Sequence, residues 1–290
     1  MVKFSHSSLL FWSHISLSCA IFVQGSILQR RSISQDLFDD FVRFFNFSSG
    51  AYQESCPSPV GTTLVTPFNN NATSTEGYVA RDDNLKQIIV AFRGSQQAQD
   101  AITDINIILL PYISPNVTYV SGAKAHAGFL IAYNSVASTV LSIVRSELAA
   151  HPDYELISTG HSLGGALASL GGASLAANFP DAKLRVFTYG QPRTGNSGYA
   201  QVVEDLVGTE NLYRAVHTTD GVPTLIPTFL GYQHHVTEYW QFEDPATPDN
   251  VKQCSGREDP TCSASIPSQG INDAHDLYFG QQVGNPEVCG

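Results

Sequence analysis

The chain has 290 residues, of which 42% are hydrophobic, 10% aromatic and 14% charged. This apolar content is enough for one large core, and it excludes a disordered or fibrous chain. With 26 acidic against 15 basic residues, the formal charge of −11 repels phosphate backbones, so no nucleic-acid partner is expected.

The first 25 residues have the pattern of a secretory signal peptide. Lys3 is followed by an apolar stretch from Leu9 to Val23 and by small residues near Gly25. That order is typical of a segment that is removed on export. A buried N-terminal helix is the alternative interpretation. The pattern predicts a secreted, extracellular protein.

A dibasic pair, Arg30 and Arg31, comes just before Ser32. Residues 26–31 are therefore a candidate propeptide. Between 32 and 290 we find no repeat, linker or break in composition, which favours a single domain and a monomer. No later uninterrupted apolar run approaches the roughly 18 residues needed to cross a bilayer, so no stable membrane insertion is expected.

The predicted elements alternate between strands and helices. Apolar side chains at helical spacing follow Ser34, which could cap that helix. The further elements expected are strands at 77–81 and 87–92, a helix at 127–150, a strand at 154–158, a helix at 163–178, a strand at 184–189, a helix near 199–206, and strands at 211–216 and 236–240. The inward residues expected in the helix at 127–150 are Phe129, Ile131, Val136, Val140, Ile143 and Leu148. This alternation predicts an α/β fold with a mostly parallel sheet flanked by helices, and ligands bind such sheets beyond the carboxyl ends of the strands.

Cysteine usage agrees with export. Cys19 lies in the predicted signal, which leaves an even set of four. Cys254 and Cys262 flank a polar loop that contains Gly and Pro, so we pair them with each other and pair Cys56 with Cys289. Metal ligation is the alternative, but no two of the four have Cys-x-x-Cys spacing, and no metal is expected.

Three Asn-x-Ser/Thr triplets also suit a secreted protein and make Asn46, Asn71 and Asn116 candidate glycosylation sites. Such triplets also arise by chance.

The most informative motif is Gly-His-Ser-Leu-Gly at residues 160–164, between a predicted strand and a helix rich in small residues. In this context the serine lies on a strained turn, and the glycines leave room for crowded backbone. Ser162 is the candidate nucleophile. The N–H of Leu163, at the start of the helix, points to where an oxyanion would form.

A nucleophilic serine needs a base and a carboxylate, which follow it in this architecture in the order acid, then histidine. His275 lies near the C-terminus and fits the base, and Asp220 follows an apolar strand and fits the acid. His217 is expected beside the acid. His234 and His235 are expected to pack beneath the substrate cleft. The remaining carboxylates considered, expected to be solvated surface charges, are Asp205, Asp244 and Asp249.

At this point the residues resemble a known family, the secreted fungal lipases of the alpha/beta-hydrolase superfamily, which include mono- and diacylglycerol lipases and a feruloyl esterase branch. The matching segments are Ala91–Ser95, Gly160–Gly164, Gly190–Asn196, His217–Pro223 and Ala274–Gly280. The resemblance implies a triad of Ser162, Asp220 and His275. It also implies that Ser95 and Leu163 supply the oxyanion donors.

By the same resemblance, the segment from Gln96 to about Ile108 occupies the position of the family's lid, a short helix over the active site. Its apolar residues fall on one helical face: Ala98, Ala101, Ile102 and Ile105. Ala101 stands at or near the place where some interfacially activated relatives have tryptophan, which argues against strong interfacial activation. A packed surface helix is the alternative.

The function expected is hydrolysis of acylglycerol esters, as in a triacylglycerol lipase, with a lipid or ester substrate met at an oil–water interface and no cofactor. The alternative is a feruloyl esterase or general carboxylesterase, because the segment from Asn250 to Asp276 is closer to that branch. A non-catalytic binding protein predicts a missing triad member, and none is missing. A peptidase with the same triad would hydrolyse casein.

Overall fold

The computed structural model describes residues 1–3, 32–95 and 107–290. Within them, the main sheet has eight strands, in the spatial order β1 (Thr63–Asn70), β2 (Thr75–Asp82), β3 (Gln87–Phe92), β6 (Glu155–His161), β7 (Leu184–Tyr189), β9 (Leu212–His217), β11 (Glu238–Gln241) and β12 (Val251–Gln253). The strands from β3 to β11 run parallel, and antiparallel strands extend both edges. The predicted mostly parallel sheet is confirmed.

Short strands form two further sheets in the described part of the chain. One has the order β10 (Tyr232–Gln233), β8 (Gly195–Asn196), β5 (Lys124–His126) and β4 (Leu109–Pro111). The other pairs β13 (Leu277–Tyr278) with β14 (Gln281–Gln282). β13 directly follows the 3-10 helix η6 (Asp273–Asp276), so it fixes the chain just after the predicted base.

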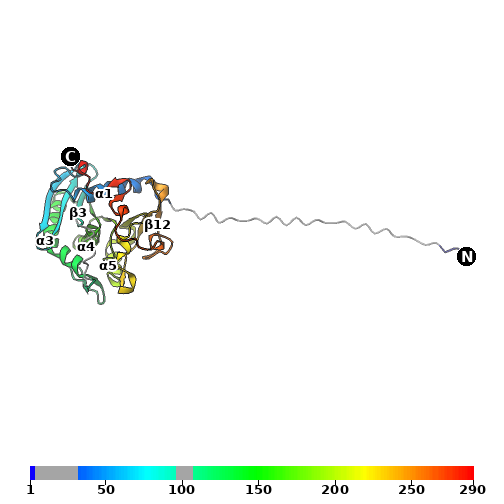
Figure 1. Ribbon diagram of the computed structural model, residues 1–290. Coiled ribbons are helices and arrows are strands. Elements are labelled where there is room, and N and C mark those ends of the chain that lie inside the picture. The colour runs from blue at the N-terminus through cyan, green and yellow to red at the C-terminus, as the bar shows by residue number, and fades with distance from the viewer. Residues whose placement is uncertain (4–31, 96–106) are drawn as a thin grey trace.

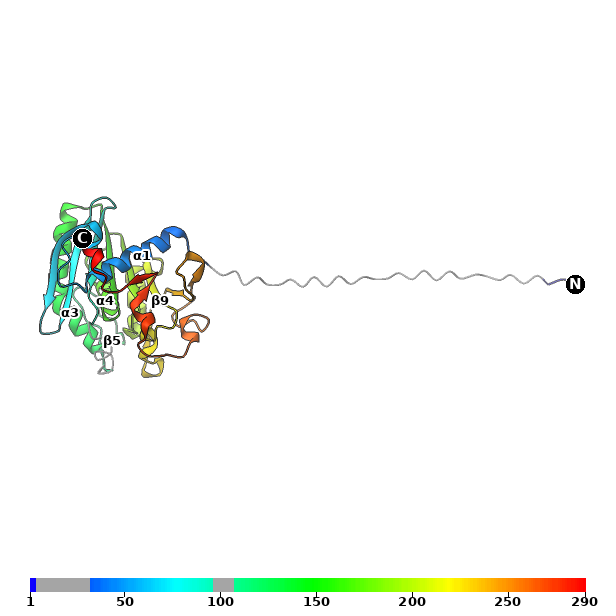
Figure 2. The same ribbon diagram turned by 45° about the horizontal axis from the view of Figure 1, so that its top comes forward.

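Helices cover both faces of the main sheet (Figure 1). α1 (Gln35–Gly50) lies across one face (Figure 2), and the other face packs against α3 (Ala127–Ala150), α4 (Leu163–Asn178) and α5 (Ser197–Val207). Each face has its own apolar core, because the central strands are buried on both sides.

α1 forms where the sequence predicts it. The Ser34 side chain accepts a hydrogen bond from the N–H of Leu37 and so caps the helix. Its apolar face buries four phenylalanines against the sheet, which are Phe41, Phe44, Phe45 and Phe47. Burying each such side chain stabilises the fold by roughly 1.5–3 kcal/mol, so packing, rather than intrinsic propensity, holds this helix in place.

The long helix α3 has the predicted bounds, but one predicted inward residue is wrong. Ile131 is 54% exposed, whereas Phe129, Val136 and Val140 are buried. At about 100° per residue, Ile131 lies roughly 200° around the helix from Phe129 and so faces away from the sheet. α3 is also long and apolar enough to span a membrane by length and composition alone. Here it packs against α4 and the strands β1 and β2.

Several strands of the structure differ from the sequence prediction, and two of them, β6 and β1, show why. β6 runs to His161 and so leads directly into the serine motif, three residues beyond the predicted end at Ser158. β1 was not predicted at all. It is an edge strand that contains Pro67 and is mostly not buried, so it lacks the clear alternation that identifies a strand.

The structure contains the two disulfides expected from the sequence, Cys56–Cys289 and Cys254–Cys262. The first joins the chain just after α1 to the C-terminus, across 233 residues. The second closes a short loop after β12, between cysteines 8 positions apart.

The three sequons lie in different surroundings. Asn71 and Asn116 are exposed. Asn46 lies within α1, and the Ser48 of its sequon is fully buried, where its hydroxyl donates to the carbonyl of Phe44.

Candidate active site

Ser162 lies on a sharp turn between β6 and α4, with φ 59° and ψ −127°. Glycines make this turn sterically feasible. A Cβ on Gly160 would lie 2.1 Å from the carbonyl oxygen of Gly164, and a Cβ on Gly164 would lie 2.3 Å from that of Phe92. Any side chain at either position would therefore displace backbone, and the strained serine depends on both glycines.

The end of β3 lies beside this turn, because Phe92 pairs with Gly160 across the sheet. Gly94 packs directly against the carbonyl oxygen of His161. This contact places Ser95 next to the turn that carries Ser162. Leu163 is the first residue of α4, so its N–H has no acceptor within the helix. The two predicted oxyanion donors thus come from neighbouring segments.

The predicted base and acid meet in the fold. Asp220 follows β9 and His275 lies in η6, and His275 Nδ1 donates to Asp220 Oδ2 at 2.9 Å. Tyr278 Oη donates to the same oxygen at 2.5 Å, and the N–H of Val222 donates to Oδ1 at 2.9 Å. The carboxylate is therefore held at both oxygens.

Both members of this pair are almost completely buried. Burial by itself would raise the pKa of Asp220; the adjacent His275 and the two other donors outweigh it and hold the pKa of this carboxyl below its usual range. An ionised carboxylate keeps the imidazole in the tautomer with the proton on Nδ1, which leaves Nε2 as an acceptor.

Ser162 and His275 both border the turn that follows β7. The N–H of Ser162 donates to the carbonyl of Tyr189 at 2.8 Å. A Cβ on the next residue, Gly190, would lie 2.8 Å from the ring of His275. Within the described residues, Ser162 Oγ and His275 Nε2 are buried polar atoms without a hydrogen-bond partner, so each is available to a reacting group.

His161, the variable residue before Ser162 in the serine motif, binds the backbone of the predicted base, His275. Its Nε2 donates to the carbonyl oxygen of His275 at 2.7 Å, and its Nδ1 accepts from the hydroxyl of Tyr52 at 2.8 Å. Burial lowers the pKa of His161 to about 3, and the neighbouring His275 adds to the effect. The ring is therefore neutral at pH 7, in the tautomer that these bonds require.

Sequence analysis assigned no role to His161, Tyr52 or Tyr278. His161 lies inside the motif, so its position was the one available signal. Tyr52 is 109 residues from His161, and Tyr278 is 58 residues from Asp220. No local pattern indicates such pairings.

The three other histidines that follow Ser162 in the chain contact backbone carbonyl groups. His217 Nδ1 donates to the carbonyl of Ala274, next to the base, and so lies near the acid as predicted. His234 Nε2 donates to the carbonyl of Pro223. His235 Nδ1 contacts the carbonyl of its own neighbour, Val236.

One carboxylate predicted to be a surface charge, Asp244, is exposed as predicted but also has partners beside the site. Asp244 is half exposed, yet it lies 3.3 Å from His217 Nε2 and accepts a bond from Gln241 at 2.9 Å. It is therefore part of the polar network beside the site rather than a freely solvated charge.

Two groups of predictions remain without a structural test of their chemistry. The lid residues Ala98, Ala101, Ile102 and Ile105 lie outside the described residues.

Among the described residues, one group has potential metal ligands close together, namely Glu238 with Cys254 and Cys262. Its two sulfurs are joined in a disulfide and cannot act as thiolate ligands.

The parallel sheet, the strained serine between strand and helix, and the buried Asp–His pair beyond the strand ends define an α/β-hydrolase. Comparison with known proteins narrows this class. The family described as "Lipase (class 3)" matches residues 89–230. The secreted alkaline triacylglycerol lipase of Penicillium cyclopium is 31% identical over 260 residues, which cover 89% of this chain and 90% of that protein. The chain belongs to the class 3 lipase family.

Solved structures agree with this assignment. A triacylglycerol lipase from Penicillium expansum superposes with a TM-score of 0.83 at 30% identity, covering 89% of this chain and 99% of that one. Lipases of Rhizopus niveus and Rhizopus oryzae are 39% identical over 227 residues. The match covers 77% of this chain and 55% of these Rhizopus proteins, so the chain spans about half of their length.

Proposed function

We propose that the protein is a secreted serine esterase that hydrolyses acylglycerols, with Ser162 as nucleophile, His275 as general base and Asp220 as the carboxylate that orients it. The relatives support this substrate class. Besides the triacylglycerol lipases above, they include a secreted mono- and diacylglycerol lipase of Fusarium solani, 35% identical over 212 residues. A solved triacylglycerol lipase at 29% identity is described as having a serine protease triad as its catalytic centre.

The observation that carries the proposal is the geometry around His275. Its Nδ1 is bound to a buried carboxylate, and its Nε2 is buried without a partner among the described residues. Its ring lies 4.4 Å from the ring of His161, the residue before the strained serine. Nucleophilic acyl transfer requires a base with one nitrogen fixed and the other free to take a proton, and we propose that Ser162 Oγ, which also has no partner among the described residues, is the hydroxyl that it serves.

In the proposed reaction, Ser162 Oγ attacks the ester carbonyl carbon while His275 Nε2 takes the hydroxyl proton. The N–H of Leu163 and a donor from Ser95 stabilise the oxyanion, and each such donor is worth about 10²–10³ in turnover. Collapse breaks the bond to the leaving alcohol, to which His275 returns the proton. Water, deprotonated by the same nitrogen, then attacks the acyl carbon, and the bond to Ser162 Oγ breaks as His275 returns the proton to that oxygen, which releases the fatty acid.

The test compares hydrolysis of emulsified triolein, tributyrin and methyl ferulate by the purified protein, with Ser162→Ala as the blank. We expect activity on the long-chain emulsion to exceed activity on ferulate, and the variant to be inactive. Ferulate cleavage with inert triolein would move the chain to the feruloyl esterase alternative. Activity that survives in Ser162→Ala would refute the proposed nucleophile.

We also propose that a monomer meets its lipid substrate at an oil–water surface. Phe229 is 85% exposed in η3 (Thr228–Leu230), nine residues after Asp220, and Ile107 and Ile108 are exposed in the segment that leads into β4. Phe229→Ser should weaken activity on emulsified triolein more than on dissolved tributyrin. Leu85→Ser is the matched control, because Leu85 is 57% exposed at the turn before β3. Equal effects of the two changes would refute the interfacial role.

Secretion and processing complete the proposal. Residues 1–25 are proposed as the signal peptide, 26–31 as a propeptide removed after Arg31, and 32–290 as one domain. Two of the curated relatives are named as secreted lipases. Glycans are proposed at Asn71 and Asn116, whose side chains are exposed, and at Asn46 only before α1 folds. N-terminal sequencing and mass determination of the exported protein test these assignments.

A further inference from the structure

We infer that the loop closed by the Cys254–Cys262 disulfide positions the acid of the triad, and that Glu258 is the residue through which it acts. The inference rests on the proposed function, because it assumes that Asp220 orients His275. Glu258 touches neither of these two residues, so it is a positioning residue rather than a catalytic one.

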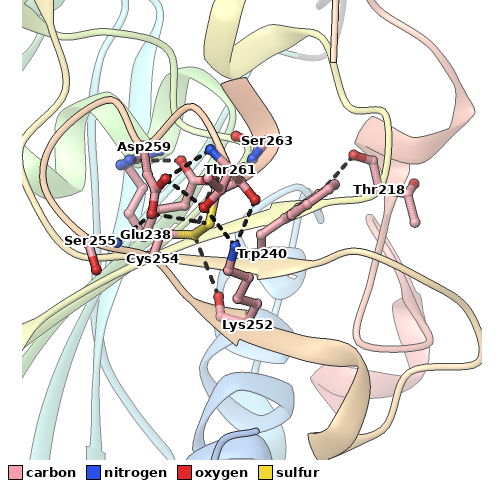
Figure 3. Close-up of a disulfide and its surroundings, with 11 residues drawn as sticks. Thr218, Glu238, Trp240, Lys252, Cys254, Ser255, Asp259, Thr261 and Ser263 are labelled. Atoms are coloured by element: carbon pink, nitrogen blue, oxygen red, sulfur yellow. Dashed lines mark hydrogen bonds and ion pairs between the residues drawn. A yellow bond between two sulfur atoms is a disulfide. The ribbon is translucent and has the colours of Figure 1, made fainter. Parts of the chain in front are cut away.

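The loop is held by its disulfide and by hydrogen bonds to its surroundings (Figure 3). The disulfide closes it, and both ends bind Glu238 on β11: the N–H of Cys254 donates to its carbonyl at 2.9 Å, and the N–H of Ser263 donates to its Oε1 at 3.0 Å. Inside the loop, the carboxylate of Asp259 accepts two backbone N–H groups. A side chain that projects from this loop is therefore held in place.

Glu258 binds two residues outside the loop. Arg193 donates to its carboxylate from Nε at 2.8 Å and from Nη2 at 2.6 Å. The N–H of His234 donates to the same carboxylate at 3.0 Å. The side chain of Arg193 is only 5% exposed, so this bidentate pair is well shielded from water.

Each of these two partners holds the backbone just after the acid. Arg193 Nη1 donates to the carbonyl of Ile226 at 2.7 Å, and His234 Nε2 donates to the carbonyl of Pro223 at 2.8 Å. These carbonyls belong to the short helix α6 (Val222–Leu225) and the residue after it. The first N–H of α6 is the donor to Asp220 Oδ1. Three hydrogen-bonded steps thus connect Glu258 to the acid.

Loss of the Glu258 charge should disturb the acid without unfolding the site. Arg193 would keep a buried charge without its carboxylate, and it would have to seek another partner, pulling on the carbonyl of Ile226. The other side of the acid loop stays anchored, because Ser268 Oγ donates to the carbonyl of Gly221 and Asn272 Nδ2 to that of Thr219. A one-sided shift of this kind lengthens the Asp–His bond.

The chain offers a matched control. Glu155 binds Arg185 in the same bidentate manner, at 2.8 and 2.9 Å, and is similarly buried. It begins β6, whereas Ser162 follows the end of that strand. Glu155→Gln therefore removes a bidentate charged pair at the opposite end of the sheet, where Arg185 keeps a second carboxylate partner in Asp40.

The experiment uses the full exported chain and a soluble ester, p-nitrophenyl butyrate, with active sites counted by diethyl p-nitrophenyl phosphate. We expect Glu258→Gln to lower kcat about tenfold or more with KM nearly unchanged, and Glu155→Gln to change kcat less than about twofold. Because a weaker Asp–His bond stabilises the imidazolium less, the acid limb of kcat/KM should move to lower pH in Glu258→Gln only.

A second variant keeps the test decisive if Glu258→Gln does not fold. Replacing both loop cysteines, C254A together with C262A, leaves Glu258 in the chain but frees its loop, and it should move kcat and the acid limb in the same direction. A parent protein that releases no p-nitrophenol from the phosphate refutes the proposed function and this inference with it. A reactive parent whose Glu258→Gln and cysteine variants behave like Glu155→Gln refutes the inference alone.

Discussion

Removal of a single hydroxyl should show how strongly the buried acid depends on its donors. Tyr278→Phe deletes the bond to Asp220 Oδ2 at 2.5 Å and leaves the bonds from His275 and the N–H of Val222. A hydrogen bond to a charged group contributes about 1.5–3 kcal/mol, and the carboxylate is too buried to replace it with water. We therefore expect the free energy of unfolding at pH 7 to fall by about 2 kcal/mol.

The loss should depend on pH in a defined direction. The pKa of Asp220 is lower in the folded protein than in the unfolded chain. Its ionised form therefore contributes stability that is present above the unfolded pKa of about 3.9 and is lost as the pH falls through the folded pKa. Without the hydroxyl of Tyr278 the folded pKa rises. The difference between parent and variant should be full at pH 7 and shrink below about pH 4.

Tyr78→Phe is the control for this measurement. The Tyr78 hydroxyl is also buried, but it donates to the neutral carbonyl oxygen of Phe47 at 2.7 Å. Its loss should cost about 1 kcal/mol at any pH. Urea unfolding curves for both variants at pH 7, 5 and 3.5 make the comparison. Equal, pH-independent losses in the two variants would show that an ionised Asp220 is not the acceptor.

Three further predictions concern the turn, the disulfides and acid stability. Gly164→Ala should cost about 3 kcal/mol or more in stability, because the new Cβ would lie 2.3 Å from a backbone oxygen. In the control Gly165→Ala, the new Cβ meets nothing closer than 3.2 Å. Thermal unfolding of the two variants tests this prediction, and equal melting temperatures would contradict it. In the chain-entropy description, loss of the disulfide across 233 residues costs about 5 kcal/mol of stability, and loss of the one across 8 residues costs about 2.5 kcal/mol. The double variant C56A/C289A should therefore melt at a lower temperature than C254A/C262A. The reverse order of melting temperatures would refute the estimate. Burial lowers the pKa of several histidines, which are His126, His161, His234 and His235. Because the unfolded chain binds these protons more tightly, the free energy of unfolding should fall as the pH drops from about 6.5 toward 4.5, with a limiting slope of about 1.4 kcal/mol per pH unit for each histidine. A urea midpoint that stays constant over this range would contradict their burial in the neutral form.

Local sequence patterns were sufficient for much of the fold. The helices at 127–150 and 163–178 and the strand at 184–189 have the bounds predicted from apolar periodicity. β1 was missed because an edge strand with one solvated side has little apolar alternation. Ile131 was misplaced because a helix with apolar residues almost all round does not reveal its buried face.

The candidate site also has features that local sequence predicts and features that it does not. The sequence by itself determined the turn at Ser162, because the strained serine and its glycines are neighbours in the chain and their spacing is a local steric requirement. The order of serine, acid and base along the chain predicts Asp220 and His275 for these roles, and the structure brings their side chains together at 2.9 Å.

Only the tertiary structure decided which groups hold these residues in place. The bonds from Tyr278 to Asp220, from Tyr52 to His161 and from Arg193 to Glu258 join residues 58, 109 and 65 positions apart. Each depends on how separate strands and loops meet at one edge of the sheet, and hydrogen-bond partners over such distances leave no periodic trace in the sequence. The predicted nucleophile is therefore indicated by a local pattern in the chain, whereas the orientation of the predicted base is set by the folded structure around it.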